Sequence, residues 1–314
     1  MIASYNQIIS YFIAFMIFMI SLYISPYYIN GDQSLYRTVY NVLPTLNIYE
    51  GFIYYKNTLT AKEFVHFIIT WIFSRIVEKD ILMSFVNAIF AYYSMQLFIK
   101  WKASIYIAAI IVLTNYYFFV LYFAADRLKF GFLFFALALL NVGNSKFYVH
   151  SFLSLTSHAQ LFIIYAAMIF NKSLIELKRV LSSGNIQKKF LISIICLFFV
   201  IILMFNQISH KFLLYFAMKD DFYISNLFKL SVFLILALIY SKRKTETISL
   251  FFPLFIVAFI LGADRINLYG YFIFLYYALP INKGFNIGII VTSVYFAYKS
   301  VFFVIKILET GNGF

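Results

Sequence analysis

The chain has 314 residues, of which 64% are hydrophobic and only 12% are charged. Soluble domains are about 45–50% apolar and about 25% charged, so this chain has too little polar surface to cover itself in water, and a soluble globular protein is excluded. The formal net charge of +13 comes from short basic clusters between apolar runs, which is typical of the loops of a membrane protein and not of a nucleic-acid-binding face.

Apolar runs recur along the whole chain without the alternating pattern of membrane strands. Because only helices or closed barrels satisfy the backbone in lipid, we expect an all-α polytopic membrane protein with a bundle of about 9–11 transmembrane helices in a single integral-membrane domain, 1–314. No basic region precedes the first run, which predicts a retained span. The candidate segments are 7–25, 64–77, 81–99, 103–124, 128–143, 147–170, 190–206, 225–240, 248–262, 267–281 and 285–307.

The distribution of Lys and Arg predicts the orientation of the loops, since basic residues in short loops favour the cytoplasm. The intervals 171–189 and 241–247 are rich in Lys and Arg. Both are therefore predicted to be cytoplasmic basic loops. The polar intervals 26–62 and 207–224 are predicted to be periplasmic loops.

Two segments conflict with this orientation if they span the membrane. The segment 64–77 is short and contains Arg75, and 147–170 is interrupted by polar residues around His158. If neither spans, the following basic loops return to the cytoplasm and Arg127 becomes external. We therefore expect re-entrant or broken segments, with His158 at the turn of one, because polar elements at membrane depth are tolerated where they line a cavity. The alternative is a bundle in which every segment spans.

Four arginines gather on the external side in this topology. Arginine is costly near hydrocarbon and its planar fork suits phosphate, so the group predicts a diphosphate ligand. The four are Arg37, Arg75, Arg127 and Arg265. For each of them the alternative is an interfacial anchor or a structural ion pair.

Two acids follow the first span and could act as a base at a sugar-transferring site. Asp32 comes directly after the span, and Glu63 opens the short segment 64–77. A base near the acceptor hydroxyl is what such a reaction needs. The alternative for Glu63 is a helix-start acid that favours the positive end of the helix. Asp126 and Asp264 each precede an Arg, which they could simply neutralise or orient.

The histidines show no metal-ligand spacing, and the chain has neither a Cys pair nor a D-x-D motif. We therefore predict no metal and no other cofactor. The adjacent Asp220 and Asp221 are expected to be solvated loop acids. His158 differs from the other histidines, because polar residues surround it inside an apolar run, and a functional role is favoured over a buried structural one. Walker and G-x-S-x-G motifs are missing from the sequence, which argues against a nucleotide-driven pump and a serine hydrolase.

Short motifs in a fixed order link these residues. Gly31 to Tyr36 is followed by Glu63-Phe64; Arg127 to Gly131 leads through Lys146 to Ser157-His158-Ala159; and Arg265 to Tyr269 is followed by Leu279-Pro280. With these motifs the chain resembles the EpsG-like branch of bacterial polysaccharide polymerases, the Wzy-type O-antigen polymerases, over most of residues 30–280. It departs from their pattern at Gln33, where an aromatic residue is common, and at Leu128 and Lys129 after the mid-chain Arg.

The resemblance implies a GT-C-like glycosyltransferase in the bacterial inner membrane, with its active site facing the periplasm. Its donor and acceptor partners would be undecaprenyl-diphosphate-linked oligosaccharides, with a chain-length regulator protein as a candidate further partner and no nucleic acid. Arg127 and Arg265 would hold the leaving diphosphate, and His158 with Asp32 or Glu63 would orient or deprotonate the attacking hydroxyl. Tyr36 and Tyr269 would contact donor or acceptor. The expected reaction inverts the anomeric centre without a metal.

Two other functions fit a basic membrane site of this kind. One is a flippase for lipid-linked oligosaccharides, although a flippase exposes its cavity to both faces and the acids and arginines here concentrate on one. The other is a membrane acyltransferase or ligase that acts on the same lipid carrier, which would use similar residues.

Overall fold

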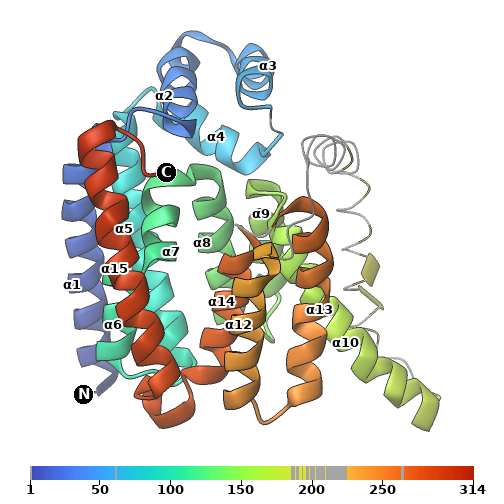
Figure 1. The fold of residues 1–314 in the computed structure, drawn as a ribbon. Coiled ribbons are helices and arrows are strands. Elements are labelled where there is room, and N and C mark those ends of the chain that lie inside the picture. Colours follow the sequence, from blue (N-terminus) through green and yellow to red (C-terminus); the bar gives the residue numbers. More distant parts are fainter. Residues whose placement is uncertain are drawn as a thin grey trace. The chain divides into compact units, whose positions relative to one another are not determined.

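The computed structural model describes residues 2–60, 62–184, 225–262 and 265–314, together with isolated positions between 188 and 209. All regular elements within these residues are helices, which confirms the predicted all-α class (Figure 1). The sequence predicts one domain, and the chain divides into two compact units: Met1–His158 with Asn282–Phe314, and Ala159–Ile281. We call them unit 1 and unit 2.

Unit 1 begins with a long helix, continues through short helices, and ends with the last helix of the chain (Figure 1). Its α-helices are α1 (Ile2–Ile24), α2 (Asp32–Val42), α3 (Ile48–Leu59), α4 (Phe64–Phe73), α5 (Lys79–Lys100), α6 (Ile105–Thr114), α7 (Tyr116–Phe119), α8 (Asp126–Leu140), α9 (Lys146–Ser157) and α15 (Ile287–Thr310). The 3-10 turns η1 (Ser25–Tyr27) and η2 (Leu43–Thr45) and the π-helical turn η3 (Val120–Ala124) lie between them, and the 3-10 turn η4 (Ile281–Gly284) precedes α15.

Among the described residues, three helices are long and apolar enough to cross a membrane: Tyr5–Tyr27, Lys79–Lys100 and Ile281–Thr310. A fourth span is formed if α6 counts together with Tyr116–Ala124, two apolar pieces that meet at a bend of 54°. These helices are compatible with a membrane protein. The larger count of about nine to eleven stays a prediction, because several of its segments fold as helices shorter than the roughly 20 residues of a full span.

The bend between α6 and α7 divides the predicted segment 103–124. Asn115 has an extended backbone and its side chain accepts a hydrogen bond from the Tyr117 backbone N–H, so it begins a new helix at this point. An Asn at this position satisfies a backbone donor that the broken helix leaves free. The sequence alone predicts one continuous segment here.

Buried polar contacts hold the long helices of unit 1 in register. Asn87 of α5 donates from Nδ2 to Ser21 Oγ of α1 at 2.9 Å and to the carbonyl of Tyr122 at 3.1 Å. Gln96 of α5 donates to Ser10 of α1 at 3.0 Å. Since neighbouring helices in lipid gain little from apolar burial, contacts of this kind help to determine which faces meet.

The predicted loop 26–62 contains helices. Together with α4, helices α2 and α3 form a group at one end of α1 and α5, which we call the cap (residues 32–73; Figure 1). The cap has its own apolar core, made of Tyr36, Val39, Leu43, Tyr55, Leu59 and Phe67. Helix α4 has only ten residues, too few to cross the hydrocarbon, as expected for the short segment 64–77.

The end of the chain returns to the start of the cap. The backbone N–H groups of Ile29 and Asn30 both donate to the carbonyl of Gly311, at 3.1 and 2.9 Å. Gly311 follows α15 with a φ of 69°, a left-handed conformation that glycine adopts without strain. The linker between α1 and α2 is therefore tied to the C-terminus.

Unit 2 contains α10 (Leu161–Ser183), α12 (Ser225–Tyr240), α13 (Lys244–Leu261) and α14 (Ile266–Ala278). Helices α12 and α14 approach closely at Gly270, where an added Cβ would lie 2.6 Å from Leu230. Residues 171–183 of the predicted cytoplasmic loop continue α10 as helix. The predicted periplasmic loop 207–224 lies outside the described residues apart from position 209.

Candidate functional site

Glu63 lies at the start of α4 and turns its side chain into the protein. The preceding helix α3 ends at Leu59, and Thr60 follows it in a left-handed conformation with a φ of 47°. Glu63 has an extended backbone and makes no side-chain capping hydrogen bond to α4. Glu63 therefore stands at the start of α4, as its place in the sequence suggests, but its side chain is completely buried and contacts residues far away in the sequence.

Arg127 is the second residue of α8, and one residue, Ala125, separates this helix from the π-helical turn η3. Consecutive residues of a helix point about 100° apart, so Asp126 and Arg127 face different neighbours. π-helical turns are rare and frequently occur at functional sites. Here the turn comes just before the two charged residues at the start of α8.

His158 lies at the break predicted inside segment 147–170. Helix α9 ends at Ser157, His158 is extended with a φ of −158°, and α10 begins at Leu161. Ser154 donates to the carbonyl of Gly131 at 2.9 Å and so holds the end of α9 against α8. The predicted break is present in the structure, while its depth in the membrane stays a prediction.

One carboxylate brings these three residues together. Nη1 of Arg127 lies 3.0 Å from Glu63 Oε2, and Nδ1 of His158 lies 3.1 Å from Glu63 Oε1. The exposed fractions of the side chains are 0% for Glu63, 3% for His158 and 13% for Arg127. Arg127 and His158 therefore lie near one another, on either side of the Glu63 carboxylate.

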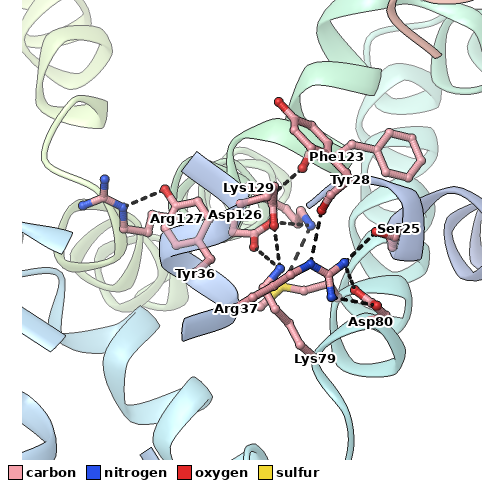
Figure 2. A network of polar contacts seen from close by, with 12 residues as sticks. Ser25, Tyr28, Tyr36, Arg37, Lys79, Asp80, Phe123, Asp126, Arg127 and Lys129 are labelled. Atoms are coloured by element: carbon pink, nitrogen blue, oxygen red, sulfur yellow. Dashed lines mark hydrogen bonds and ion pairs between the residues drawn. The ribbon is translucent and has the colours of Figure 1, made fainter. Parts of the chain in front are cut away.

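Tyr36 completes this group, which we call the Glu63 cluster (Tyr36, Glu63, Arg127 and His158). Nε of Arg127 donates to the Tyr36 hydroxyl at 3.0 Å (Figure 2). Burial raises the pKa of Tyr36, an effect that the nearby Arg127 partly opposes. Tyr36 is therefore a neutral acceptor for Arg127 at ordinary pH. The other terminal nitrogen of Arg127, Nη2, has no hydrogen-bond partner in the part of the chain that the structure describes.

Asp126 belongs to a second buried group, the Asp126 cluster (Gln33, Lys79, Asp126 and Lys129); Figure 2 shows Lys79, Asp126 and Lys129. Its carboxylate lies 2.9 Å from Nζ of Lys79 and 3.4 Å from Nζ of Lys129. Lys79 also donates to Gln33 Oε1 at 2.7 Å. Asp126 therefore compensates two lysines rather than Arg127, the partner suggested by its place in the sequence.

Arg37 and Arg75 have extensive contacts within unit 1. Arg37 makes a bidentate pair with Asp80 at 2.8 and 3.0 Å and donates to two backbone carbonyls (Figure 2). Arg75 donates to the carbonyls of Trp71, Leu43 and Leu46 and lies over the Trp71 ring. These contacts favour the structural alternative for both, and their diphosphate role stays a prediction.

His66 lies between the two clusters. Its Nδ1 shares a hydrogen bond of 3.0 Å with the Tyr55 hydroxyl, and its Nε2 has no partner among the residues described. Burial lowers the pKa of His66 to about 3, so this imidazole is neutral near pH 7. A cavity of about 10 Å³ beside it is also lined by Tyr36, Lys79 and Asp126, which is close to the space of a single water molecule.

The other predicted site residues are not members of these two clusters. Asp32 is exposed in the first turn of α2, one helical turn before Tyr36. Arg265 and Tyr269 belong to unit 2. Arg265 directly precedes α14, and Tyr269 is buried within that helix. Asp264, Asp220 and Asp221 lie outside the described residues.

Sequence reasoning did not assign a role to Lys79, Lys129, His66 or Gln33. Lys129 and Gln33 are two positions where the chain departs from the polymerase pattern, and both lie in the Asp126 cluster. The position of Lys129 inside an apolar segment could have pointed to this cluster, because a charged side chain in such a segment usually has a charged or polar partner.

The geometry of the Glu63 cluster suits proton transfer next to an anion. A carboxylate on Nδ1 orients an imidazole and stabilises its protonated form. A guanidinium with a free N–H edge can bind a phosphate oxygen. As for metals, His, Cys, Asp and Glu side chains do not gather in threes anywhere in the described ranges; the absence of a metal from the reaction stays a prediction.

The fold and the clusters define an all-helical protein with helices of membrane-spanning length and a buried carboxylate–arginine–histidine site. Comparisons of the chain with protein-family models, curated proteins and solved structures found no match.

Proposed function

We propose that the chain is a polysaccharide polymerase, an inverting membrane glycosyltransferase that joins undecaprenyl-diphosphate-linked repeat units. The observation that carries the proposal is the single buried carboxylate of Glu63, which holds both Arg127 and His158 at 3.0 and 3.1 Å. Glycosyl transfer from a lipid diphosphate needs a base at the acceptor hydroxyl and positive charge at the leaving diphosphate. The cluster has a candidate for each role.

In this proposal His158 takes the proton and Glu63 positions it. The acceptor hydroxyl oxygen forms a bond with the donor's anomeric carbon while the bond between that carbon and the phosphate oxygen breaks. The electron pair of the broken bond goes to the diphosphate, and the hydroxyl proton goes to the imidazole of His158. Attack in one step from the opposite side inverts the anomeric centre.

Arg127 supplies charge to the leaving diphosphate. Its Nε and Nη1 are held by Tyr36 and Glu63, so the guanidinium is fixed before the substrate binds. The two clusters together also carry an excess of positive charge, since three basic side chains (Arg127, Lys79 and Lys129) are paired with two acidic ones (Glu63 and Asp126). Fixed cations of this kind stabilise charge that grows as the glycosidic bond breaks.

The proposal includes the finer features that the resemblance implies. These are a GT-C-like bundle of about nine to eleven spans in the bacterial inner membrane, with the Glu63 cluster facing the periplasm. Arg265 is proposed as a second contact of the diphosphate. Because Arg265 belongs to unit 2, Arg265→Ala tests its role separately from the Glu63 cluster.

A deletion strain tests the function in cells. Loss of a polymerase leaves a single repeat unit on the cell surface, whereas loss of a flippase leaves none. Purified protein supplied with lipid-linked repeat units should also form a ladder of longer chains. An intact polymer in the deletion strain, or a missing ladder with protein that is folded, would contradict the proposal and leave the acyltransferase or ligase as the candidate.

A further inference from the structure

A polar groove lies on the cap, next to the Asp126 cluster and outside the Glu63 cluster. It has a volume of about 660 Å³ and runs between the C-terminal half of α2 and residues 74–80. The Tyr40 hydroxyl donates to the carbonyl of Val77 at 2.8 Å and joins the two walls. Sites for small ligands have volumes of about 300–1,000 Å³, so the groove has room for a short oligosaccharide.

The charges that line the groove are largely compensated within the protein. Arg37 is paired with Asp80, and Lys79 is paired with Asp126. The remaining charged residues of the lining are Arg75 and Glu78, one of each sign. A groove with balanced charge is poorly suited to a dianion such as a diphosphate, which gains most from uncompensated cations.

The side chains that can still form hydrogen bonds suit hydroxyl groups. The Asn41 amide and the Glu78 carboxylate make no hydrogen bond to any residue that the structure describes. The Ser74 hydroxyl donates to the Trp71 carbonyl, which leaves its oxygen able to accept. An amide offers donors and an acceptor together, and a carboxylate offers acceptors. Hydroxyls, which both donate and accept, match this set.

The groove also adjoins the small cavity beside His66. Tyr40 and Lys79 line both the groove and the small cavity beside His66. Tyr36 lines that small cavity as well, and its hydroxyl contacts Arg127. The groove therefore lies next to the small cavity, where a glycan that reacts near Arg127 and extends over the cap surface would meet it.

We infer that this groove binds the sugar residues of the growing or incoming glycan, as a neutral carbohydrate subsite separate from the diphosphate site. The inference rests on the proposed function, since that function supplies the glycan. It assigns Arg37 and Arg75 to the walls of a sugar-binding groove, where they hold the backbone and the groove in shape.

The chain carries its own reporter for this groove. It has two tryptophans, Trp71 and Trp101. The centre of the Trp71 ring lies 3.9 Å from the guanidinium carbon of Arg75, a residue that lines the groove. Trp101 directly follows α5. In a Trp101→Phe protein, all tryptophan fluorescence comes from Trp71. The probe is an oligosaccharide of repeat units released from the polymer of the cells that encode the chain, and inorganic diphosphate is the competing probe.

We expect the oligosaccharide to change Trp71 fluorescence with saturation, and diphosphate to leave it unchanged. Asn41→Ala and Ser74→Ala should each weaken oligosaccharide binding by about fivefold, the value of one hydrogen bond. Asn57→Ala and Ser34→Ala are matched controls, because both residues are exposed on the cap outside the groove, and they should bind as the parent does. Thermal unfolding of each variant checks that it is folded.

Two results would overturn the inference. Saturation by diphosphate with no response to the oligosaccharide would identify an anion site. Equal oligosaccharide binding by the parent and both groove variants would place the sugar elsewhere. The ladder assay on the same protein separates this inference from the proposed function: a protein that polymerises without binding sugar in the groove overturns only the groove, and one that binds sugar without polymerising overturns only the polymerase.

Discussion

Replacement of Glu63 by Gln removes the charge at the centre of the site while nearly keeping its shape. Glu63 is fully buried with Arg127 Nη1 at 3.0 Å. At an effective dielectric constant of about 20, two unit charges at this distance attract by about 5 kcal/mol. Part of this attraction offsets the cost of burying both charges. Removal of one member of a buried pair typically costs about 3–5 kcal/mol, because the other charge stays buried without a partner.

The same substitution should remove the orientation of His158. A side-chain amide accepts hydrogen bonds on its oxygen only, so in the Glu63→Gln variant it cannot accept from both Arg127 and His158 on separate atoms as the carboxylate does. We expect Glu63→Gln to lower the rate of polymerisation by about 100- to 10,000-fold, the range for loss of general base catalysis. The rate is measured on the repeat-unit ladder well below the unfolding temperature, with Glu50→Gln, an exposed acid of the cap, as the matched control.

A double variant separates stability from chemistry. In Glu63→Gln with Arg127→Met both charges of the pair are removed, so the unfolding temperature should return most of the way to that of the wild type. Polymerisation should not return, because the proposed base has lost its positioning residue and the diphosphate has lost its contact. Activity within tenfold of wild type in Glu63→Gln, or recovered activity in the double variant, would refute the assignment and make Glu63 a structural ion.

Four further outcomes test other parts of the structure. Arg127→Lys should keep the fold but lose at least tenfold in polymerisation, because a compact ammonium cannot reproduce the planar fork that spans Tyr36, Glu63 and a phosphate; wild-type activity would show that the fork is not needed. Asp126→Asn should lower the free energy of unfolding by about 3–5 kcal/mol, since Lys79 and Lys129 remain buried without a counter-charge; an unchanged unfolding temperature would contradict this. His66 has a pKa lowered to about 3, so from pH 6.5 downward the unfolded chain binds the proton first and stability falls, by about 2 kcal/mol at pH 5; this loss should disappear in His66→Gln, and equal pH profiles would show that His66 is not responsible. Polymerisation should proceed in excess chelator at a rate close to that with magnesium, because the chain has no D-x-D motif; restoration by magnesium would direct attention to the remaining acids.

The sequence alone predicted the helical class, because a chain with 64% hydrophobic residues, few charges and no strand-like alternation satisfies its backbone in lipid as helices. It also predicted the break at His158, since a run of polar side chains inside an apolar segment is a local signal. The shortness of α4 follows from the same kind of local information. By contrast, the bend at Asn115 depends on one backbone hydrogen bond within an apolar run, and hydropathy does not register it.

The partners of the charged residues were decided by tertiary structure. Asp126 stands beside Arg127 in the sequence, but a helix directs neighbouring side chains about 100° apart, and the carboxylate meets Lys79 and Lys129 instead. Arg37 and Arg75 carry the same charge as Arg127, yet each is engaged by carbonyls and, for Arg37, by Asp80. Charge type alone does not distinguish a structural arginine from one with a free edge.

The Glu63 cluster combines both sources of information. The sequence identified Glu63, Arg127 and His158 as candidates because each is a polar group next to or inside an apolar segment. Their meeting at one carboxylate depends on how α4, α8 and α9 pack, since Arg127 and His158 are 64 and 95 positions from Glu63. Burial then makes the contact strong, because charges shielded from water interact more strongly with each other than with solvent. That shielding is a property of the packed helices and cannot be read from any one segment.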